Sequence, residues 1–293
     1  MTLAHFSAPA KINLYLQVLG RRVDGYHDLS TSFAFVDVAD VLRIEPCDDL
    51  VVHCSSTHLE GEKNLVWRVL QALRSNHGVS MGLSVHIDKN LPEQAGLGGG
   101  SSDAATALMA ANRLWSLDLS RDELIDFAAP FGADIPCFIF GRASMASGVG
   151  ERLRPLDEPL PEGHVLLVYP GVGLSTAKVF GKLAVGSTGL TPSEPTDTMR
   201  ARNAGHLLGR NDLELAASQL CPDMAHILEL LRRKADKAWM SGSGSACVGL
   251  FEHQSSLRDA ASHIGQAWPR AWTHVGKLQD EHPFAREWND HGA

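Results

Sequence analysis

A regular alternation of apolar and more polar residues marks the start of the chain. Between residues 8 and 19, Ile12, Leu14, Leu16 and Val18 occupy every second position. Side chains of a strand point alternately to its two faces, so this period of two predicts a β-strand with one buried face. Two further apolar runs of strand length lie at residues 36–44 and 83–87.

Apolar residues at helical spacing predict several helices. Asn64 can cap a helix whose apolar residues follow up to Leu73, and Ser120 with Glu123 forms a capping-box pattern before a second helix. Residues 224–231 carry the apolar stripe of a third helix. Because strands and helices mix without a regular β-α-β alternation, we expect an α+β fold rather than a doubly wound parallel sheet.

Proline-rich stretches indicate how the chain is divided. Three prolines within residues 153–163 predict a boundary between two domains, which we place at residues 1–158 and 159–293. The polar, proline-containing stretch 186–198 predicts a long mobile loop. The polar tail after residue 279 is expected to be loosely held.

Composition and charge narrow the class of protein. The 293 residues carry a net charge of -8, which argues against a nucleic-acid-binding surface. No apolar run is long enough to cross a membrane, and the first residues do not have the pattern of a signal peptide. Five scattered cysteines without a C-x-x-C pair favour a reducing, cytoplasmic location. The histidines show no metal-ligand spacing, so we expect no protein-bound metal site.

A glycine-rich loop is the strongest local signal for chemistry. Four glycines, Gly96 and residues 98–100, fall within five positions and are followed by a helical stretch from Ala104. Glycine backbone leading into a helix N-terminus offers free N–H groups and a favourable dipole to an anion such as a triphosphate. Ser101 and Ser102 add hydroxyl groups at the expected capping positions. The alternative is a flexible turn capped by serine, and the loop is not a Walker A motif.

Three motifs together resemble the GHMP kinases, a family of small-molecule kinases. They are residues 8–14 (APAKINL), the glycine loop at 92–102 and residues 240–247 (MSGSGSAC). Residues 24–29 (DGYHDL) and 131–138 (FGADIPCF) resemble the branch that phosphorylates diphosphocytidyl-methylerythritol rather than the sugar or homoserine branches. The resemblance implies two α+β domains with the active site in the cleft between them, and ATP as co-substrate.

The resemblance assigns the catalytic roles to Lys11 and Asp134. Asp134 corresponds to the general base that receives the proton of the acceptor hydroxyl. Lys11 corresponds to the cation that keeps this carboxylate ionised and stabilises the charge of the transferred phosphoryl group. Spacing alone does not bring the two residues together. Without the resemblance, a surface lysine and a turn aspartate would be the preferred interpretations.

The resemblance also suggests residues that hold the acceptor, diphosphocytidyl-methylerythritol. Asn13 shares the polar face of the first strand with Lys11 and is expected to orient this substrate. Tyr26 and His27 resemble the pair that recognises cytosine by stacking and hydrogen bonding. Phe180 resembles the second aromatic wall, although a core phenylalanine is an equally good interpretation, and Thr176 is expected nearby.

The nucleotide is expected to lie along the glycine loop. Asn64 and Lys89 occupy positions that hold the adenosine end in the family, although Lys89 as an ordinary solvated charge is nearly as good an interpretation. The loop itself would contact the phosphates through Pro92, Glu93, Gln94, Ala95, Gly96, Leu97, Gly98, Gly99, Gly100, Ser101 and Ser102. Glu93 and Gln94 depart from the family pattern, which places small or apolar residues there. Mg²⁺ is expected with ATP, but the sequence names no ligand for it.

Other features leave alternatives open. Residues 242–245 have the appearance of a second phosphate loop, or of a tight turn before a strand at 246–251. Asn211 and Asp212 favour a helix start with a structural role. The function itself has two rivals, which are another GHMP kinase acting on homoserine, mevalonate or a sugar, and a nucleotide-binding sensor without catalysis. A monomer or weak homodimer is expected.

Overall fold

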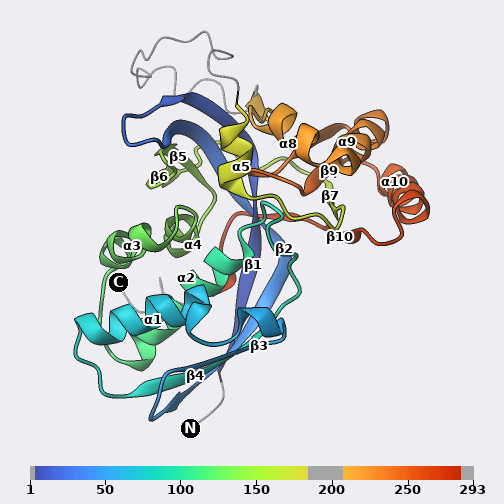
Figure 1. Cartoon of the computed structure of the whole chain (residues 1–293). Helices are drawn as coiled ribbons and strands as arrows, with labels where there is room; N and C mark the ends of the chain where they lie inside the picture. Colours follow the sequence, from blue (N-terminus) through green and yellow to red (C-terminus); the bar gives the residue numbers. More distant parts are fainter. Residues whose placement is uncertain (1–3, 184–206, 285–293) are drawn as a thin grey trace.

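Two β-sheets with helices on their outer faces make up the computed structural model, which describes residues 4–183 and 207–284 (Figure 1). The larger sheet has seven strands: β1 (Ala4–Arg21), β2 (His27–Cys47), β3 (Val51–Cys54), β4 (Gly82–Asp88), β5 (Ser144–Gly148), β6 (Arg152–Pro155) and β11 (Leu278–Gln279). The smaller sheet has four strands in the order β10-β7-β9-β8: β7 (His164–Tyr169), β8 (Lys237–Met240), β9 (Cys247–Phe251) and β10 (Trp272–Gly276).

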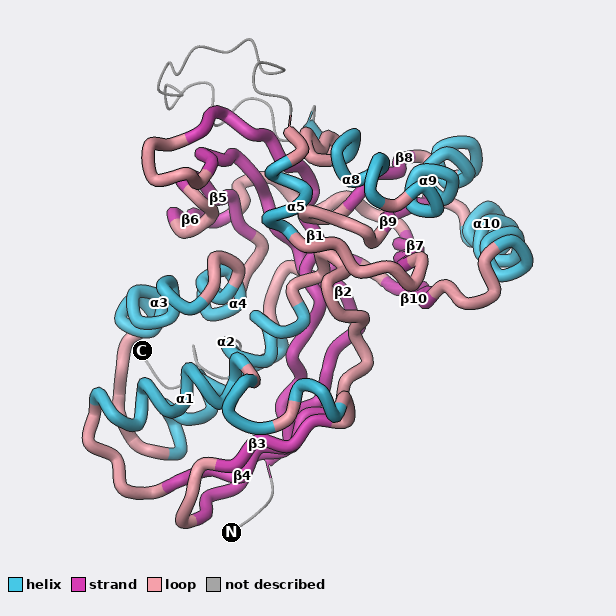
Figure 2. The backbone as a smooth tube through the Cα atoms, in the orientation of Figure 1, coloured by secondary structure: helices cyan, strands magenta, loops and turns pink. Residues whose placement is uncertain are grey.

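The helices fall into two groups along the chain. The first group consists of η1 (Thr57–Leu59), η2 (Gly61–Lys63), α1 (Leu65–Asn76), α2 (Gly99–Leu114), α3 (Arg121–Ala128), η3 (Ala129–Phe131) and α4 (Ile135–Phe140). The second group consists of α5 (Thr176–Gly181), α8 (Glu214–Leu220), α9 (Pro222–Lys234) and α10 (Gln254–Ala267). Figure 2 shows α1 to α4 on one side of the long strands and α8 to α10 beside the smaller sheet.

The long strand β2 is the central strand of the larger sheet. It pairs with β1 along almost its whole length on one edge, and with β5, β11 and β4 in turn on the other. The alternation in β1 is as expected, but the prediction of a single buried face was wrong. Ile12 and Leu14 pack toward the smaller sheet, and the opposite residues Lys11 and Asn13 are buried as well. Their burial beneath neighbouring elements makes them part of an internal polar site.

Three apolar clusters hold the two sheets and their helices together. One lies between the larger sheet and α1 to α4, and another lies between the smaller sheet and α8 to α10. The third joins β1 to β7 and includes the fully buried Trp239. The α+β class and the two-part architecture expected from the sequence are confirmed.

Three of the local helix signals are confirmed. Asn64 caps α1 by accepting a hydrogen bond from the backbone N–H of Val66, and Ser120 with Glu123 forms the expected capping box of α3. The apolar stripe of residues 224–231 lies on α9 with its large side chains buried.

The last described residues differ from expectation, whereas residues 285–293 of the predicted tail lie outside the described residues. His282 is fully buried and Phe284 packs in the core of the larger sheet, so residues 280–284 are not loosely held. The predicted loop 186–198 lies outside the described residues. The connection 153–163 leads from β6 into β7, the first strand of the smaller sheet. The exact domain boundary stays a prediction, because β11 returns to pair with β2.

Candidate active site

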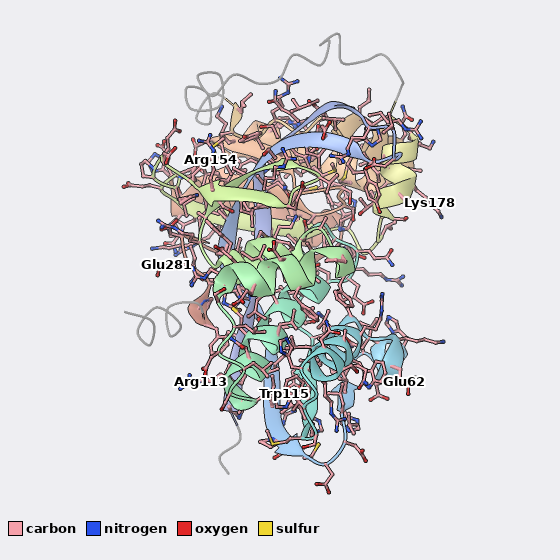
Figure 3. All side chains as sticks on the ribbon, turned by 90° about the vertical axis from the view of Figure 1, so that its left-hand side faces the viewer. Glu62, Arg113, Trp115, Arg154, Lys178 and Glu281 are labelled. Atoms are coloured by element: carbon pink, nitrogen blue, oxygen red, sulfur yellow. The ribbon has the colours of Figure 1, made fainter. Side chains whose placement is uncertain are left out.

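A cavity of about 1350 Å³ lies where β1, β2, the glycine loop, α5 and the 242–243 turn meet. It is lined by all the residues proposed from the sequence for catalysis, substrate and nucleotide, with the exception of Leu97 and Ser102. Elements of both parts of the molecule contribute to it. In Figure 3, Glu62 of η2 and Lys178 of α5 lie on the same side of the molecule, and their neighbours Lys63 and Ala177 line the cavity.

Lys11 and Asp134 come together in this cavity. The Nζ atom of Lys11 lies 3.3 Å from Oδ2 of Asp134 and donates a hydrogen bond of 2.8 Å to Oδ1 of Asn13. Lys11 is buried on β1, and its backbone N–H donates to the carbonyl oxygen of Leu97 in the glycine loop. Asp134 immediately precedes α4, and its side chain is 39% exposed. The arrangement places an accessible carboxylate beside a buried cation.

The glycine loop meets the rest of the site through close backbone contacts. Gly96 and Gly98 have φ angles of 81° and 73°, which glycine adopts without strain. A Cβ atom at Gly96 would lie 2.2 Å from the carbonyl oxygen of Ser241, and one at Gly98 would lie 2.8 Å from the Phe138 ring. The loop therefore fits against α4 and the third motif only because side chains are absent.

The helix after this loop starts earlier than the sequence suggested. α2 begins at Gly99 with Gly98 as its N-cap, so Ser101 and Ser102 lie within the first turn and are not capping residues. Ser101 lines the cavity. The Ser102 hydroxyl is buried, and it has no hydrogen-bond partner among the described residues. Backbone N–H groups of the first helical turn are unpaired within a helix, so this end can bind an anion.

Aromatic residues also line the cavity. The rings of His27 and Phe180 are stacked with their centroids 4.9 Å apart, while Tyr26 is largely exposed. Burial lowers the pKa of His27, and the positive charge of Arg21 lowers it further. Phe180 also packs against the core of the smaller-sheet part, as the core interpretation predicted, and its role as an aromatic wall for the substrate stays a prediction. A neutral imidazole beside an aromatic ring offers stacking surface and a hydrogen-bonding edge.

The third motif contacts both the glycine loop, through the hydrogen bond from the Ser241 hydroxyl to the carbonyl oxygen of Gly96, and α5. The hydroxyl groups of Thr176 and Ser243 are 2.9 Å apart, and both residues line the cavity. Residues 241–246 form a turn before β9, as one of the two interpretations predicted. Asn211 supports this turn by donating hydrogen bonds to the carbonyl oxygens of Met240 and Gly242. It is not a helix cap, because α8 begins only at Glu214.

Lys89 is not a solvated charge. It is buried between the carboxylates of Asp40 and Asp103, and its Nζ atom lies 2.7 Å from Oδ2 of Asp103. Burial lowers the pKa of Lys89, yet the two carboxylates outweigh this effect and raise it overall. Asn64 likewise has structural partners, because its amide donates to the carbonyl oxygen of Leu59 in addition to capping α1. Both residues line the cavity, so their contact with a nucleotide stays a prediction.

The departure at Glu93 has a structural explanation, whereas Gln94 contributes through its backbone. The Glu93 carboxylate accepts a hydrogen bond from Ser56 and lies 2.9 Å from Nε2 of His58. The Gln94 carbonyl oxygen accepts from the backbone N–H of Leu174, and its φ angle is 51°. The pair therefore ties the glycine loop to two neighbouring segments that also line the cavity.

Sequence reasoning missed three polar residues beside the cavity. Asp40, Asp103 and Thr31 are buried and interact with Lys89 or Asn13. Asp103 directly follows the glycine-loop motif, which ends at Ser102. No local pattern marked Asp40 or Thr31, because their partners are distant in sequence.

Residues 4–183 and 207–284 were searched for metal sites and for membrane-spanning helices. Within these ranges, no group of three or more histidine, cysteine, aspartate or glutamate side chains is arranged to hold a metal ion. No helix there is long and apolar enough to span a membrane.

Sequence comparisons give the family. The model of the GHMP kinases N terminal domain matches residues 64–142, and that of the GHMP kinases C terminal domain matches residues 196–270. Curated proteins called 4-diphosphocytidyl-2-C-methyl-D-erythritol kinase are similar along most of the chain. The one from Halorhodospira halophila is 41% identical, covering 89% of each chain, and the one from Herminiimonas arsenicoxydans is 38% identical, covering 97% of this chain and 98% of its own.

Solved structures agree with this result. A crystal structure of 4-(cytidine 5'-diphospho)-2C-methyl-D-erythritol kinase matches with a TM-score of 0.75 and 36% identity, covering 94% of this chain and 99% of the other. Mevalonate kinase from Methanococcus jannaschii shares the fold, with a TM-score of 0.70 at 13% identity and coverage of 95% and 99%. The chain belongs to the GHMP kinases, and within them to the family of the 4-diphosphocytidyl-2-C-methyl-D-erythritol kinases.

Proposed function

We propose that the protein transfers the γ-phosphoryl group of ATP to the 2-hydroxyl group of 4-diphosphocytidyl-2-C-methyl-D-erythritol, a step of the non-mevalonate isoprenoid pathway. The observation that carries the proposal is the Lys11–Asp134 pair, with 3.3 Å between Nζ and Oδ2, in the same cavity as the glycine loop. The names of relatives that are about 40% identical along most of the chain supply the substrate.

The reaction needs a base, a cation and an anchor for phosphate. The acceptor hydroxyl gives its proton to Asp134 while its oxygen bonds to the γ-phosphorus, and the bond to the β-phosphate oxygen breaks to release ADP. Lys11 stabilises the charge on the transferred group. The backbone N–H groups of Gly99 to Ser101, at the start of α2, hold the phosphates.

We place the cytidyl end of the acceptor against His27 and Phe180, which line the cavity. His27 and Phe180 offer a stacked aromatic surface, and the exposed Tyr26 lies beside them in the chain. Thr176 and Asn13 line the same cavity as Asp134. Asn64, Lys89 and the glycine loop form the nucleotide side of the cavity.

Mg²⁺ is proposed to accompany ATP. Proteins usually hold this ion with one or two carboxylates together with substrate phosphates and water, so an all-protein cage is not required. Its role is to neutralise the β- and γ-phosphate oxygens. A cytoplasmic location and a monomeric or weakly dimeric state remain predictions of the sequence.

The test is ADP release by the purified protein with a panel of acceptors. We expect turnover with 4-diphosphocytidyl-2-C-methyl-D-erythritol and background rates with homoserine, mevalonate, galactose and the acceptor lacking its cytidyl group. Turnover without a cytidyl requirement would favour another GHMP activity. Nucleotide binding without turnover on any acceptor would favour a sensor.

A further inference from the structure

Thr31 lies on β2, the strand that pairs with the part of β1 carrying Lys11 and Asn13. It is 1% exposed and lines the cavity, although no motif of the sequence includes it. The pairing of β1 with β2 shifts register between Asn13 and Tyr15, where Leu14 is an extra residue in the ladder. This bulge brings the Thr31 hydroxyl within hydrogen-bonding reach of both Asn13 and Tyr15.

The Thr31 hydroxyl fixes the orientation of the Asn13 amide. A hydroxyl group has one proton to donate, and that of Thr31 goes to the carbonyl oxygen of Tyr15. Its oxygen therefore acts as the acceptor toward Nδ2 of Asn13, at 2.8 Å. The amide nitrogen must face Thr31, so Oδ1 of Asn13 must face Lys11, where it accepts a hydrogen bond.

Lys11 is thereby held between two acceptors. Its Nζ atom is 2.8 Å from the neutral amide oxygen of Asn13 and 3.3 Å from the charged Oδ2 of Asp134. The shorter contact is with the uncharged partner, so the amide keeps the ammonium group from closing fully on the carboxylate. An ammonium group has three N–H donors, which leaves one for an oxygen of the transferred phosphoryl group.

We propose that Thr31 is a positioning residue for phosphoryl transfer, which holds the Lys11 ammonium group at its working distance from Asp134 through the Asn13 amide. The inference rests on the proposed function. Thr31 itself touches no reacting atom in this scheme. Its effect reaches the reaction through Asn13 and Lys11, and should appear in kcat more than in nucleotide binding.

The backbone of Asn13 is held independently of Thr31. Its N–H donates to the Ser241 hydroxyl at 3.2 Å, and its carbonyl oxygen accepts from Nε1 of Trp239 at 2.8 Å. Loss of the Thr31 hydroxyl should therefore free the Asn13 side chain while the strand stays in place. This makes the hydroxyl a suitable target for a localised change.

The test compares Thr31→Val, which removes the hydroxyl and keeps the shape, with Thr31→Ser, which keeps the hydroxyl. We expect T31V to lower kcat about 10- to 100-fold with KM for ATP within about twofold, because small misplacements of reacting groups are costly. T31S should stay within about threefold of the wild type in kcat. If T31V does not fold, Thr31→Ala serves in its place.

A double-mutant cycle separates positioning from a general structural role. T31V introduced into an Asn13→Ala background should lower kcat by no more than about twofold further, because the amide that Thr31 orients is already gone. Equal losses in both backgrounds, a T31S variant as impaired as T31V, or an unimpaired T31V would overturn the inference. Absence of turnover in the wild type would instead refute the proposed function.

Discussion

Two lysine–aspartate clusters lie close together in this site, yet their surroundings differ. Lys11 meets one carboxylate, that of Asp134, which is 39% exposed and opens into the cavity. Lys89 meets two carboxylates, those of Asp40 and Asp103, and none of these three side chains is more than 8% exposed. The first cluster can exchange partners with a substrate, whereas the second is closed by its own contacts.

The difference shows that the same residue types can form either an accessible pair or a closed, buried cluster. Asp40 accepts hydrogen bonds from the backbone N–H groups of Asn90 and Leu91, so it fixes the segment that leads into the glycine loop. Burial raises the pKa of Asp103, and this effect outweighs the Lys89 ammonium group, which lowers it. Two carboxylates thus compete for one cation in the closed cluster, while the open one has a single carboxylate available to take a proton.

Asp134→Asn, which tests the open cluster, should have the largest effect of the substitutions. An amide cannot accept the hydroxyl proton as a base, so kcat should fall about 10³-fold, with little change in the unfolding midpoint because the side chain is partly exposed. ADP release and thermal unfolding measure the two effects. Asp259→Asn, in the surface pair with Lys234, is the matched control and should leave kcat unchanged. A D134N variant within tenfold of wild-type kcat would remove the assigned role.

Asp40→Asn tests the closed cluster. The change leaves Lys89 with a poorer partner in a buried setting and places an amide nitrogen near other donors, so the free energy of unfolding should fall by about 3 kcal/mol. KM for ATP should rise because the segment leading into the glycine loop loses its anchor. Urea denaturation and initial rates provide the measurements. A variant that loses kcat but keeps its stability would mean that Asp40 belongs with the reacting groups.

Asp103→Asn should have the smallest effect and the most informative pH dependence. Oδ1 of Asp103 has no hydrogen-bond partner among the described residues. Because the neutral amide replaces a buried carboxylate that is costly to ionise, the free energy of unfolding should fall by only about 1 kcal/mol at pH 7.

The sign of the pH effect follows from the raised pKa of Asp103. At pH values above 3.8, the ordinary pKa of the carboxyl group, folded wild-type protein binds the Asp103 proton more tightly than the unfolded chain does. The free energy of unfolding of the wild type therefore falls as pH rises. Asparagine does not titrate, so the free energy of unfolding of D103N should rise relative to that of the wild type between pH 5 and pH 8. Movement in the opposite direction would show that Lys89 dominates the titration of Asp103.

Sequence reasoning succeeded where the interacting residues are close in the chain or carry a motif. The Ser120–Glu123 capping box and the Asn64 cap depend on neighbours within a few positions. The glycine loop could be identified because its composition directly reflects the close backbone contacts at Gly96 and Gly98. The Lys11–Asp134 pair came from family resemblance, since nothing local joins two residues so far apart.

The contacts that escaped prediction depend on strand register and three-dimensional packing. The alternation in β1 predicts neither the bulge near Leu14 nor which residue of β2 lies under Asn13. Burial of the polar face around Lys11 could not be foreseen, because polar alternation normally indicates solvent. The buried Lys89 follows β4, and its partner Asp40 lies on β2, far from it in the sequence.

The support of Asn13 by Trp239 has a consequence for biosynthesis. A ribosome makes β1 first, but the indole that holds the Asn13 carbonyl oxygen is made much later, after most of the larger sheet has been synthesised. The stretch of β1 that carries Lys11 and Asn13 must therefore wait for β8 before it can make all of its final contacts. Neither part of the molecule alone contains both Asn13 and Trp239. We therefore expect separately produced fragments to be active only if they reassociate.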